Sequence, residues 1–233
     1  MTGGLQAAVA SRIPGAASLG LVLPPSALPV AAALLAEPDR VAGLIESRTP
    51  VRMADRRVAA TLWWYSASTV LLTPALAGLV TGVPLSGRLA DMSLAFRADG
   101  LPVAAVSRSG TDDVAADVRE TLAEVIGTVA PAGRMGERPL WAIATDSIAN
   151  QLLALGRALG DVPAATAHAA PLAAAIGAPL PVPRYVDVAG ARFTRRASCC
   201  LIVELPGGSL CTSCPRRPPA ERRGLLAQAA RWL

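Results

Sequence analysis

Residues 58–87, VAATLWWYSASTVLLTPALAGLVTGVPLSG, carry no charged side chain and determine how the rest of the chain is interpreted. Apolar side chains recur in this stretch at three- and four-residue spacing, which is the period of one helix face. We therefore predict a long helix from Arg52 to about Val80. A kink is expected at Pro74, because proline removes a backbone hydrogen bond inside a helix.

The same stretch raises the question of a membrane. Residues 58–87 and the uncharged residues 13–36 both exceed the ~20 residues that a spanning helix needs. Prolines and glycines interrupt both stretches, and much of their apolar character comes from alanine, which contributes little transfer free energy. We interpret them as buried helices, find no signal peptide and expect a cytoplasmic protein. Peripheral association with a membrane stays compatible with this composition.

Composition excludes several kinds of chemistry. All 22 basic residues are arginine, so no lysine is present for a phosphate-binding Walker loop or a Schiff base. The only histidine is His168, which rules out His-rich zinc sites within this chain. We interpret His168 as a packed or solvent-edge residue. A net charge of +5 would suit nucleic acid, but only 3% of residues are aromatic and the arginines are dispersed, so we expect no nucleic-acid partner.

Further elements follow the long helix. Residues 92–107 alternate in polarity around Asp99-Gly100, which predicts a β-hairpin. Helices are expected over three further stretches: residues 111–129, a stretch that begins at Trp141 or Thr145 and ends at Leu159, and residues 220–233. The predicted fold class is α+β, predominantly helical with two small β-hairpins, the C-terminal hairpin carrying a metal cluster. We expect a mainly helical domain over residues 1–190, with residues 191–233 packed on it.

All four cysteines lie in residues 195–215, RRASCCLIVELPGGSLCTSCP, with the spacing C-C-x10-C-x2-C. Leu201–Leu205 favours a strand, residues 206–209 a turn, and Leu210 the start of a return strand. Such a hairpin would bring the two cysteine pairs to one end, so the spacing indicates a metal site. A [2Fe–2S] cluster, a structural zinc ion, and disulfides or free thiols all stay open on spacing alone.

The cysteine motif, with its Pro206-Gly207-Gly208 turn and the proline after the last cysteine, resembles the C-terminal signature of the FhuF-type ferric-siderophore reductases. Upstream, the helix with Trp63-Trp64-Tyr65 and residues 89–107 are similar to the central region of that family. Members often carry aromatic residues after the cysteine pair, whereas this chain has Leu201, Ile202 and Val203. That departure bears on the identity of the substrate more than on the cluster.

The resemblance implies one-electron reduction of siderophore-bound Fe(III) to Fe(II) in the cytoplasm. It also implies a [2Fe–2S] cluster ligated by all four cysteines of the chain, Cys199, Cys200, Cys211 and Cys214. The chain has no G-x-G-x-x-G motif, so electrons would come from an external donor such as a ferredoxin or a flavoprotein reductase. The competing hypotheses are a structural zinc module and an iron–sulfur carrier or sensor without siderophore turnover.

Arginines flank the cysteine motif on both sides: Arg192, Arg195, Arg196, Arg216 and Arg217. They would offset the negative charge of a four-thiolate cluster or dock an acidic donor, and the alternative is that they are solvated surface residues. The sequence does not name the siderophore, the donor, the substrate pocket or the oligomeric state. We interpret Trp63-Trp64-Tyr65 as helix core, and the alternative is that this segment lines a pocket that approaches the hairpin.

Overall fold

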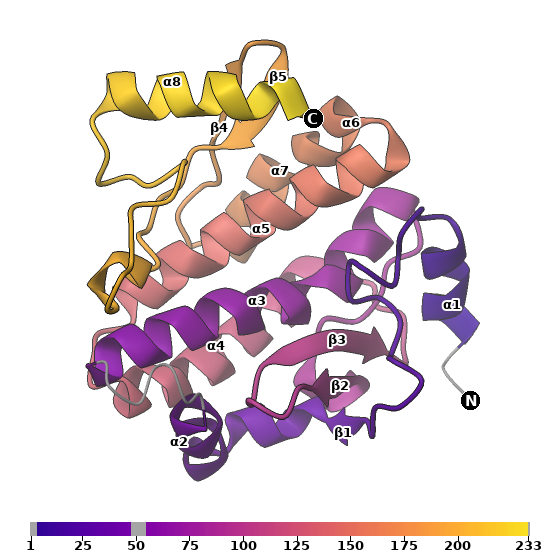
Figure 1. Cartoon of the computed structure of the whole chain (residues 1–233). Coiled ribbons are helices and arrows are strands. Elements are labelled where there is room, and N and C mark those ends of the chain that lie inside the picture. Colours follow the sequence, from indigo (N-terminus) through magenta and orange to yellow (C-terminus); the bar gives the residue numbers. More distant parts are fainter. Residues whose placement is uncertain (1–3, 48–54, 233) are drawn as a thin grey trace.

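Helices α3 (Arg56–Thr81) and α5 (Arg138–Leu159) pack side by side at the centre of the molecule (Figure 1). The computed structural model describes residues 4–47 and 55–232. The Asp55 carboxylate caps α3 by accepting a hydrogen bond from the backbone N–H of Arg57 at 3.0 Å. Gly82 ends the helix in the left-handed conformation, with φ of 71°, which costs glycine little.

Several of the remaining helices pack against this central pair. Helix α4 (Val114–Ala132) packs against α3 and α5, and also contacts the short helices α2 and α7. These other helical segments are α1 (Gly4–Ser11), η1 (Ala32–Ala36), α2 (Pro38–Glu46), α6 (Val162–Ala167), α7 (Ala169–Ile176), α8 (Pro219–Ala229) and η5 (Ala230–Trp232). None of the helices in the described residues is both long and apolar enough to cross a membrane. The cytoplasmic location stays a prediction.

A three-stranded antiparallel sheet packs beside α3, in the order β1 (Val30–Ala31), β2 (Met92–Phe96), β3 (Pro102–Ser107). The predicted hairpin over residues 92–107 is confirmed, and Gly100 in its turn has φ of 75°. The buried amide of Gln6 ties α1 to this sheet, because it donates to the carbonyl of Ala105 at 2.8 Å and accepts from the N–H of Ser107 at 2.7 Å.

The predicted fold class is confirmed: helices dominate, and a second hairpin of β4 (Tyr185–Val188) and β5 (Ala191–Thr194) lies close to the cysteines. The strand expected over Leu201–Leu205 is wrong. That segment forms a single 3₁₀ turn, η4 (Ile202–Glu204), with local hydrogen bonds in place of a ladder. A Cβ at Gly208 would lie 2.0 Å from the carbonyl oxygen of Ile202, so this glycine permits the chain to fold back on the turn.

The long predicted helix is confirmed from Arg56 onward, and its expected start at Arg52 lies outside the described residues. Trp63 and Trp64 are core, as interpreted from sequence: both are fully buried. Their indole nitrogens donate to the carbonyls of Gly100 at 3.1 Å and Leu140 at 2.9 Å.

The remaining helix boundaries differ by a few residues. The helix predicted over 111–129 begins at Val114, because the carboxylate of Asp113 caps it through the N–H of Ala116 at 2.9 Å. The helix predicted over 141–159 begins at Arg138, with Pro139 in its first turn where the missing N–H costs nothing. The terminal helix ends at Ala229 and is followed by η5, and Leu233 lies outside the described residues. The division into residues 1–190 and 191–233 stays a prediction.

Candidate metal centre

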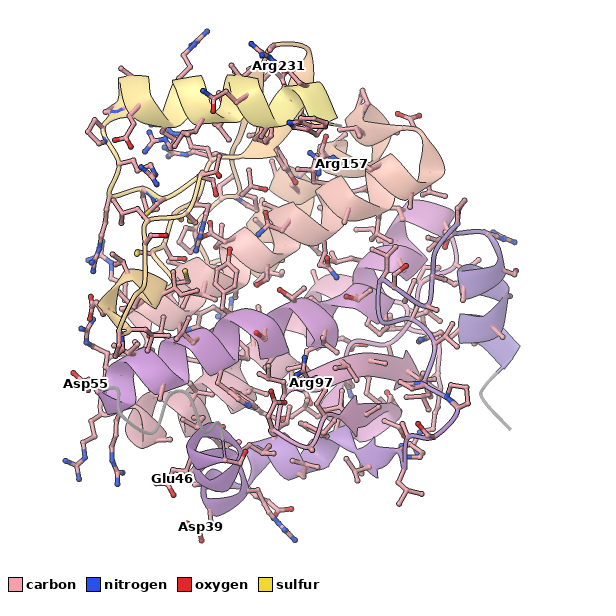
Figure 2. The ribbon with its side chains drawn as sticks, in the orientation of Figure 1. Asp39, Glu46, Asp55, Arg97, Arg157 and Arg231 are labelled. Atoms are coloured by element: carbon pink, nitrogen blue, oxygen red, sulfur yellow. The ribbon has the colours of Figure 1, made fainter. Side chains whose placement is uncertain are left out.

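The segment that carries the cysteines, residues 197–215, is called here the cysteine loop. It follows β5 and its 3₁₀ turn contacts α3. The loop lies beside the N-terminal end of α3, where Asp55 is labelled in Figure 2. Cys200 and Cys214 are buried, whereas Cys199 and Cys211 are half-buried. All four cysteines are free thiols. The loop therefore gathers four free thiols against the helical body, partly shielded from water.

The thiols come together in two pairs. The sulfur atoms of Cys199 and Cys214 are 3.9 Å apart, and Cys200 lies beside Cys211, whose thiol has the largest effect on the pKa of Cys200. Each pair thus takes one member from the adjacent cysteines and one from the C-x2-C segment. The hydrogen bond from Cys211 lowers the pKa of the Cys200 thiol to about 5, against the opposing effect of burial, and it raises the pKa of Cys211.

Backbone N–H groups also face the sulfurs. Leu201 has the left-handed φ of 62°, which a leucine rarely adopts. In this conformation the N–H of Leu201 acts to lower the pKa of Cys199, which burial raises, and the N–H of Ile202 acts with Cys211 to lower the pKa of Cys200. Consecutive N–H groups that turn toward one side form an anion-binding concavity, so the unusual backbone at Leu201 suits negatively charged sulfur.

Arg196 supplies a buried positive charge to the same site. Its side chain is 6% exposed, and Nη1 lies 3.3 Å from the sulfur of Cys211. The guanidinium stacks over the ring of Tyr65, a residue of α3, with 4.6 Å from Cζ to the ring centre. Within residues 4–47 and 55–232, Nε and Nη2 of Arg196 form no hydrogen bond. Because an arginine is always charged, Arg196 places a fixed cation against the thiols.

Asp146, on α5, holds both Arg196 and the start of the cysteine loop. Its side chain is 1% exposed and lies 3.5 Å from Nε of Arg196. It accepts hydrogen bonds from the N–H of Ala197 at 2.6 Å, and from the N–H and hydroxyl of Ser198 at 3.0 and 2.6 Å. Burial raises the pKa of Asp146 despite these donors. The helical body thus fixes the loop through one buried carboxylate.

The other predicted arginines have different environments. Arg217 donates to the carbonyl of Cys211 at 2.9 Å, and Arg216 pairs with Glu204 at 2.9 Å, so both stabilise the cysteine loop. Arg192 instead pairs with Asp187 of β4 at 2.8 Å, and Arg195 is exposed. Of the five flanking arginines, Arg196 thus lies against a thiol sulfur, Arg216 and Arg217 hold the loop, and Arg192 pairs with β4. That they offset the charge of a cluster or dock a donor stays a prediction.

The sequence patterns did not identify Asp146, and they named Tyr65 only as part of the Trp63-Trp64-Tyr65 segment. Asp146 is the only charged residue between Arg138 and Arg157, within an otherwise apolar and neutral helix. A lone carboxylate in such a helix is costly to bury unless it has partners, which is the signal that could have identified it. Among the residues expected near the site, Tyr65 alone of the Trp-Trp-Tyr segment reaches Arg196, and burial raises its pKa to about 12. His168 lies half-buried between α6 and α7.

The donor set fits a dinuclear centre, because its four thiols lie in two pairs. Zinc in a structural site needs four ligands around a single ion. In residues 4–47 and 55–232, no group of three or more His, Cys, Asp or Glu side chains is arranged to hold one ion. Two thiol pairs, with N–H donors to sulfur and a buried cation beside them, match what an iron–sulfur cluster with four cysteine ligands requires.

A mostly helical body that carries a four-thiol loop of this kind defines a candidate iron–sulfur protein. Residues 196–216 match the family model of the FhuF 2Fe-2S C-terminal domain, and all four cysteines lie within the matched segment. The match implies a [2Fe–2S] cluster and is consistent with a siderophore-interacting iron reductase. No curated protein matches the chain.

Proposed function

We propose that this chain is a ferric-siderophore reductase, which reduces siderophore-bound Fe(III) to Fe(II) by one electron. The observation that carries the proposal is the paired arrangement of four thiols inside the segment that matches the FhuF 2Fe-2S C-terminal domain. We propose Cys199, Cys200, Cys211 and Cys214 as the cluster ligands.

The chemistry needs one electron for each iron. A [2Fe–2S] cluster held by the four cysteines would supply one-electron chemistry, with an external one-electron donor as the source of the electron that converts Fe(III) to Fe(II). Siderophores hold Fe(III) through hard oxygen ligands, and a lower charge on the metal weakens each of these contacts. The iron then becomes exchangeable. We propose a ferredoxin or a flavoprotein reductase as the donor.

The residues around the thiols have roles of their own in this proposal. Arg196 and the N–H groups of Leu201 and Ile202 would stabilise the additional negative charge that the site acquires on reduction. Asp146 would keep Arg196 in place, and the contacts of Tyr65 and Asp146 exclude water from one side of the guanidinium. Charges in such a dry environment act more strongly than charges in water.

The test starts with protein purified without oxygen, in which iron and zinc are counted and the visible spectrum is recorded. We expect about two irons per chain, and thiolate-to-iron bands that bleach with dithionite. The reduced protein is then mixed with ferric siderophores in the presence of a chelator that turns coloured only with Fe(II). Formation of the coloured Fe(II) complex at a rate that depends on protein concentration is the expected result.

Cys214→Ser is the matched variant, because it changes one sulfur to oxygen and leaves the size of the side chain nearly unchanged. We expect it to lose the iron, the colour and the reduction. A colourless wild-type protein with one tightly held zinc would contradict the proposal and identify a structural module. A coloured protein that bleaches but never reduces a ferric siderophore would identify an electron carrier or sensor instead.

A further inference from the structure

A cavity of about 590 Å³ opens beside Cys199, on the side of the cysteine loop that faces α3 and the α4–α5 connection. It is called here the arginine pocket. Three of its lining residues are arginines, Arg57, Arg134 and Arg138, and Met135 and Leu201 supply apolar surface. Its volume is in the range of pockets that bind small molecules.

The arginine pocket has an excess of positive charge. Its lining contains no aspartate or glutamate. Arg57 is largely compensated, because Glu204 lies 2.7 Å from it. Within the part of the chain that the structure describes, Arg134 and Arg138 form no ion pair with a carboxylate, and both are exposed. Two uncompensated guanidinium groups therefore face a cavity that reaches a proposed cluster ligand.

The connection that carries these arginines is tightly packed. A Cβ at Gly133 would lie 2.6 Å from the Cβ of Ala60 on α3, so this glycine permits close approach of the two elements. The N–H of Arg134 donates to the carbonyl of Pro131 at 3.0 Å, and the N–H of Met135 donates to that of Ala130 at 3.0 Å. The backbone of Arg134 is thus fixed at the end of α4, and only its side chain extends toward the pocket.

We propose that the arginine pocket binds the ferric chelate and selects chelates with a net negative charge, those with catecholate or hydroxycarboxylate oxygens. This inference rests on the proposed function. Three dianionic catecholates around Fe(III) give a trianionic complex, whereas three monoanionic hydroxamates give a neutral one. The planar guanidinium donates two hydrogen bonds at once to such oxygens, which ammonium or hydroxyl groups do less well.

The charge of the pocket also favours the reaction. When the chelated Fe(III) gains its electron, the complex becomes more negative by one charge. Arg134 and Arg138 then bind the reduced complex more strongly than the oxidised one, and such differential binding assists reduction. The effect requires a cavity that reaches the electron source, which the presence of Cys199 in the lining provides. The apolar surface of Met135 and Leu201 suits the scaffold that links the chelating groups.

A second basic cavity is the competing location. It has a volume of about 600 Å³ between α8, β4 and the cysteine loop, and Arg195 and Arg223 are among its lining residues. None of the four cysteines lines it. We therefore assign the chelate to the arginine pocket, and Arg195 and Arg223 provide a control with the same change in charge.

The experiment measures binding without reduction, using the iron-loaded protein and chelates of Ga(III), which has the charge of Fe(III) but accepts no electron under these conditions. An anionic gallium tris-catecholate and a neutral gallium tris-hydroxamate are titrated by calorimetry at low salt. We expect the anionic chelate to bind about tenfold more tightly. The preference should shrink as salt is raised, because the arginines are exposed and screened.

The double variant R134Q/R138Q should lower affinity for the anionic chelate about tenfold and leave affinity for the neutral one within about twofold. The control R195Q/R223Q should change neither. Equal binding of the two chelates, or a larger loss of affinity in the control than in R134Q/R138Q, would overturn the assignment. Arginine-dependent gallium binding without any reduction of the ferric chelate would support the pocket and contradict the proposed function. Reduction of ferric chelates without any preference for anionic ones would support the proposed function and contradict the assignment of the pocket.

Discussion

Two buried aspartates of this protein each pair with an arginine, and the two pairs differ in how they are exposed to water. In the helical body, Asp117 is 4% exposed, while its partner Arg88 is 49% exposed and donates to it at 2.8 Å. At the cysteine loop, Asp146 and Arg196 are 1% and 6% exposed, and their closest approach is 3.5 Å. One pair thus keeps its cation in water, and the other has both charges buried.

The pKa directions of the two carboxyl groups are opposite. Burial tends to raise the pKa of Asp117, but hydrogen bonds from Arg88, Ser86 and Thr111 outweigh it, and the pKa falls below its usual value. Burial also raises the pKa of Asp146, and there the donors from Ser198 and Ala197 do not outweigh it. Asp117 is therefore better stabilised as an anion than Asp146.

This difference indicates that one pair stabilises the fold and that the other serves the thiol site. The Arg88–Asp117 pair has the features of a structural contact, since its donors face the carboxylate directly. In the Arg196–Asp146 pair, Nε lies 3.5 Å from the carboxylate, Nη1 lies 3.3 Å from the sulfur of Cys211, and Nη2 has no hydrogen-bond partner among the described residues. A buried arginine with unsatisfied donors is costly to the fold, and such costs are commonly found at functional sites. Arg196 therefore brings its charge to the thiols, whereas Arg88 brings its charge to a carboxylate of the helical body.

The largest expected effect follows from removing Asp146. Asp146→Ala leaves Arg196 buried without a counter-charge and removes the acceptor for Ala197 and Ser198, and breaking a buried pair in this way costs ~3–5 kcal/mol. We expect the cysteine loop to detach, so that the iron bound per chain falls sharply. Iron analysis, far-ultraviolet circular dichroism and urea denaturation measure these changes.

Asp161→Ala is the matched control for this prediction. Asp161 caps α6 through the N–H of Ala164 at 2.9 Å, and losing such a cap costs ~0.5–2 kcal/mol. The iron content of this control should stay unchanged. Equal iron content in Asp146→Ala and the wild type would show that Asp146 does not hold the loop.

Replacing Asp117 is expected to lower the free energy of unfolding by less than replacing Asp146, and the loss should depend on pH. Asp117→Asn should lower the free energy of unfolding by ~1–3 kcal/mol at pH 7, because charge-assisted hydrogen bonds from Arg88 and Ser86 are weakened. The folded pKa of Asp117 lies below its unfolded value of ~3.9, so its stabilisation is complete above that pH. It is lost as the pH falls through the folded pKa.

Urea denaturation of both proteins between pH 7 and pH 3, followed by the fluorescence of buried Trp63 and Trp64, tests this dependence. The difference between wild type and Asp117→Asn should be constant above about pH 5 and shrink toward pH 3. A difference that stays the same at pH 3 would mean that the charge of Asp117 contributes nothing. The iron content should not change, which distinguishes this pair from that of Asp146.

The helical body was largely predictable because its elements have periodic patterns and recognisable termini. The apolar period of α3 and the Asp99-Gly100 turn both express local rules, and the structure follows them. The cysteine spacing likewise indicated a metal site. The strand expected over Leu201–Leu205 failed because its β-prone composition is overridden by the backbone turn at Leu201, which directs two N–H groups to sulfur.

The surroundings of the thiols were less predictable, since they combine residues that are distant in sequence. Asp146 and Arg196 are separated by 50 residues, and no local pattern in either segment predicts their contact. Arg134 and Arg138 reach the arginine pocket because a short connection joins α4 to α5. Only a lone carboxylate in an apolar helix gave a local signal, and its partner could not be inferred from it.

The smallest effect, and the most specific to function, concerns the reduction potential of the proposed cluster. On reduction the site gains one negative charge, which the guanidinium of Arg196, 3.3 Å from the sulfur of Cys211, stabilises. Arg196→Gln should therefore lower the midpoint potential, on the order of 60 mV, which is one factor of ten for one electron. Redox titration followed in the visible spectrum measures this shift.

Two further variants distinguish charge at this position from charge in general. Arg196→Lys keeps the cation but loses the planar donors and the stacking on Tyr65, so we expect a smaller decrease in potential than for Arg196→Gln. Arg195→Gln removes the same charge from the exposed neighbour, where salt screens it, and should change the potential by less than about 15 mV. If Arg195→Gln and Arg196→Gln shifted the potential equally, the net charge of the chain would set it. The contrast between an exposed and a buried arginine would then have no functional meaning.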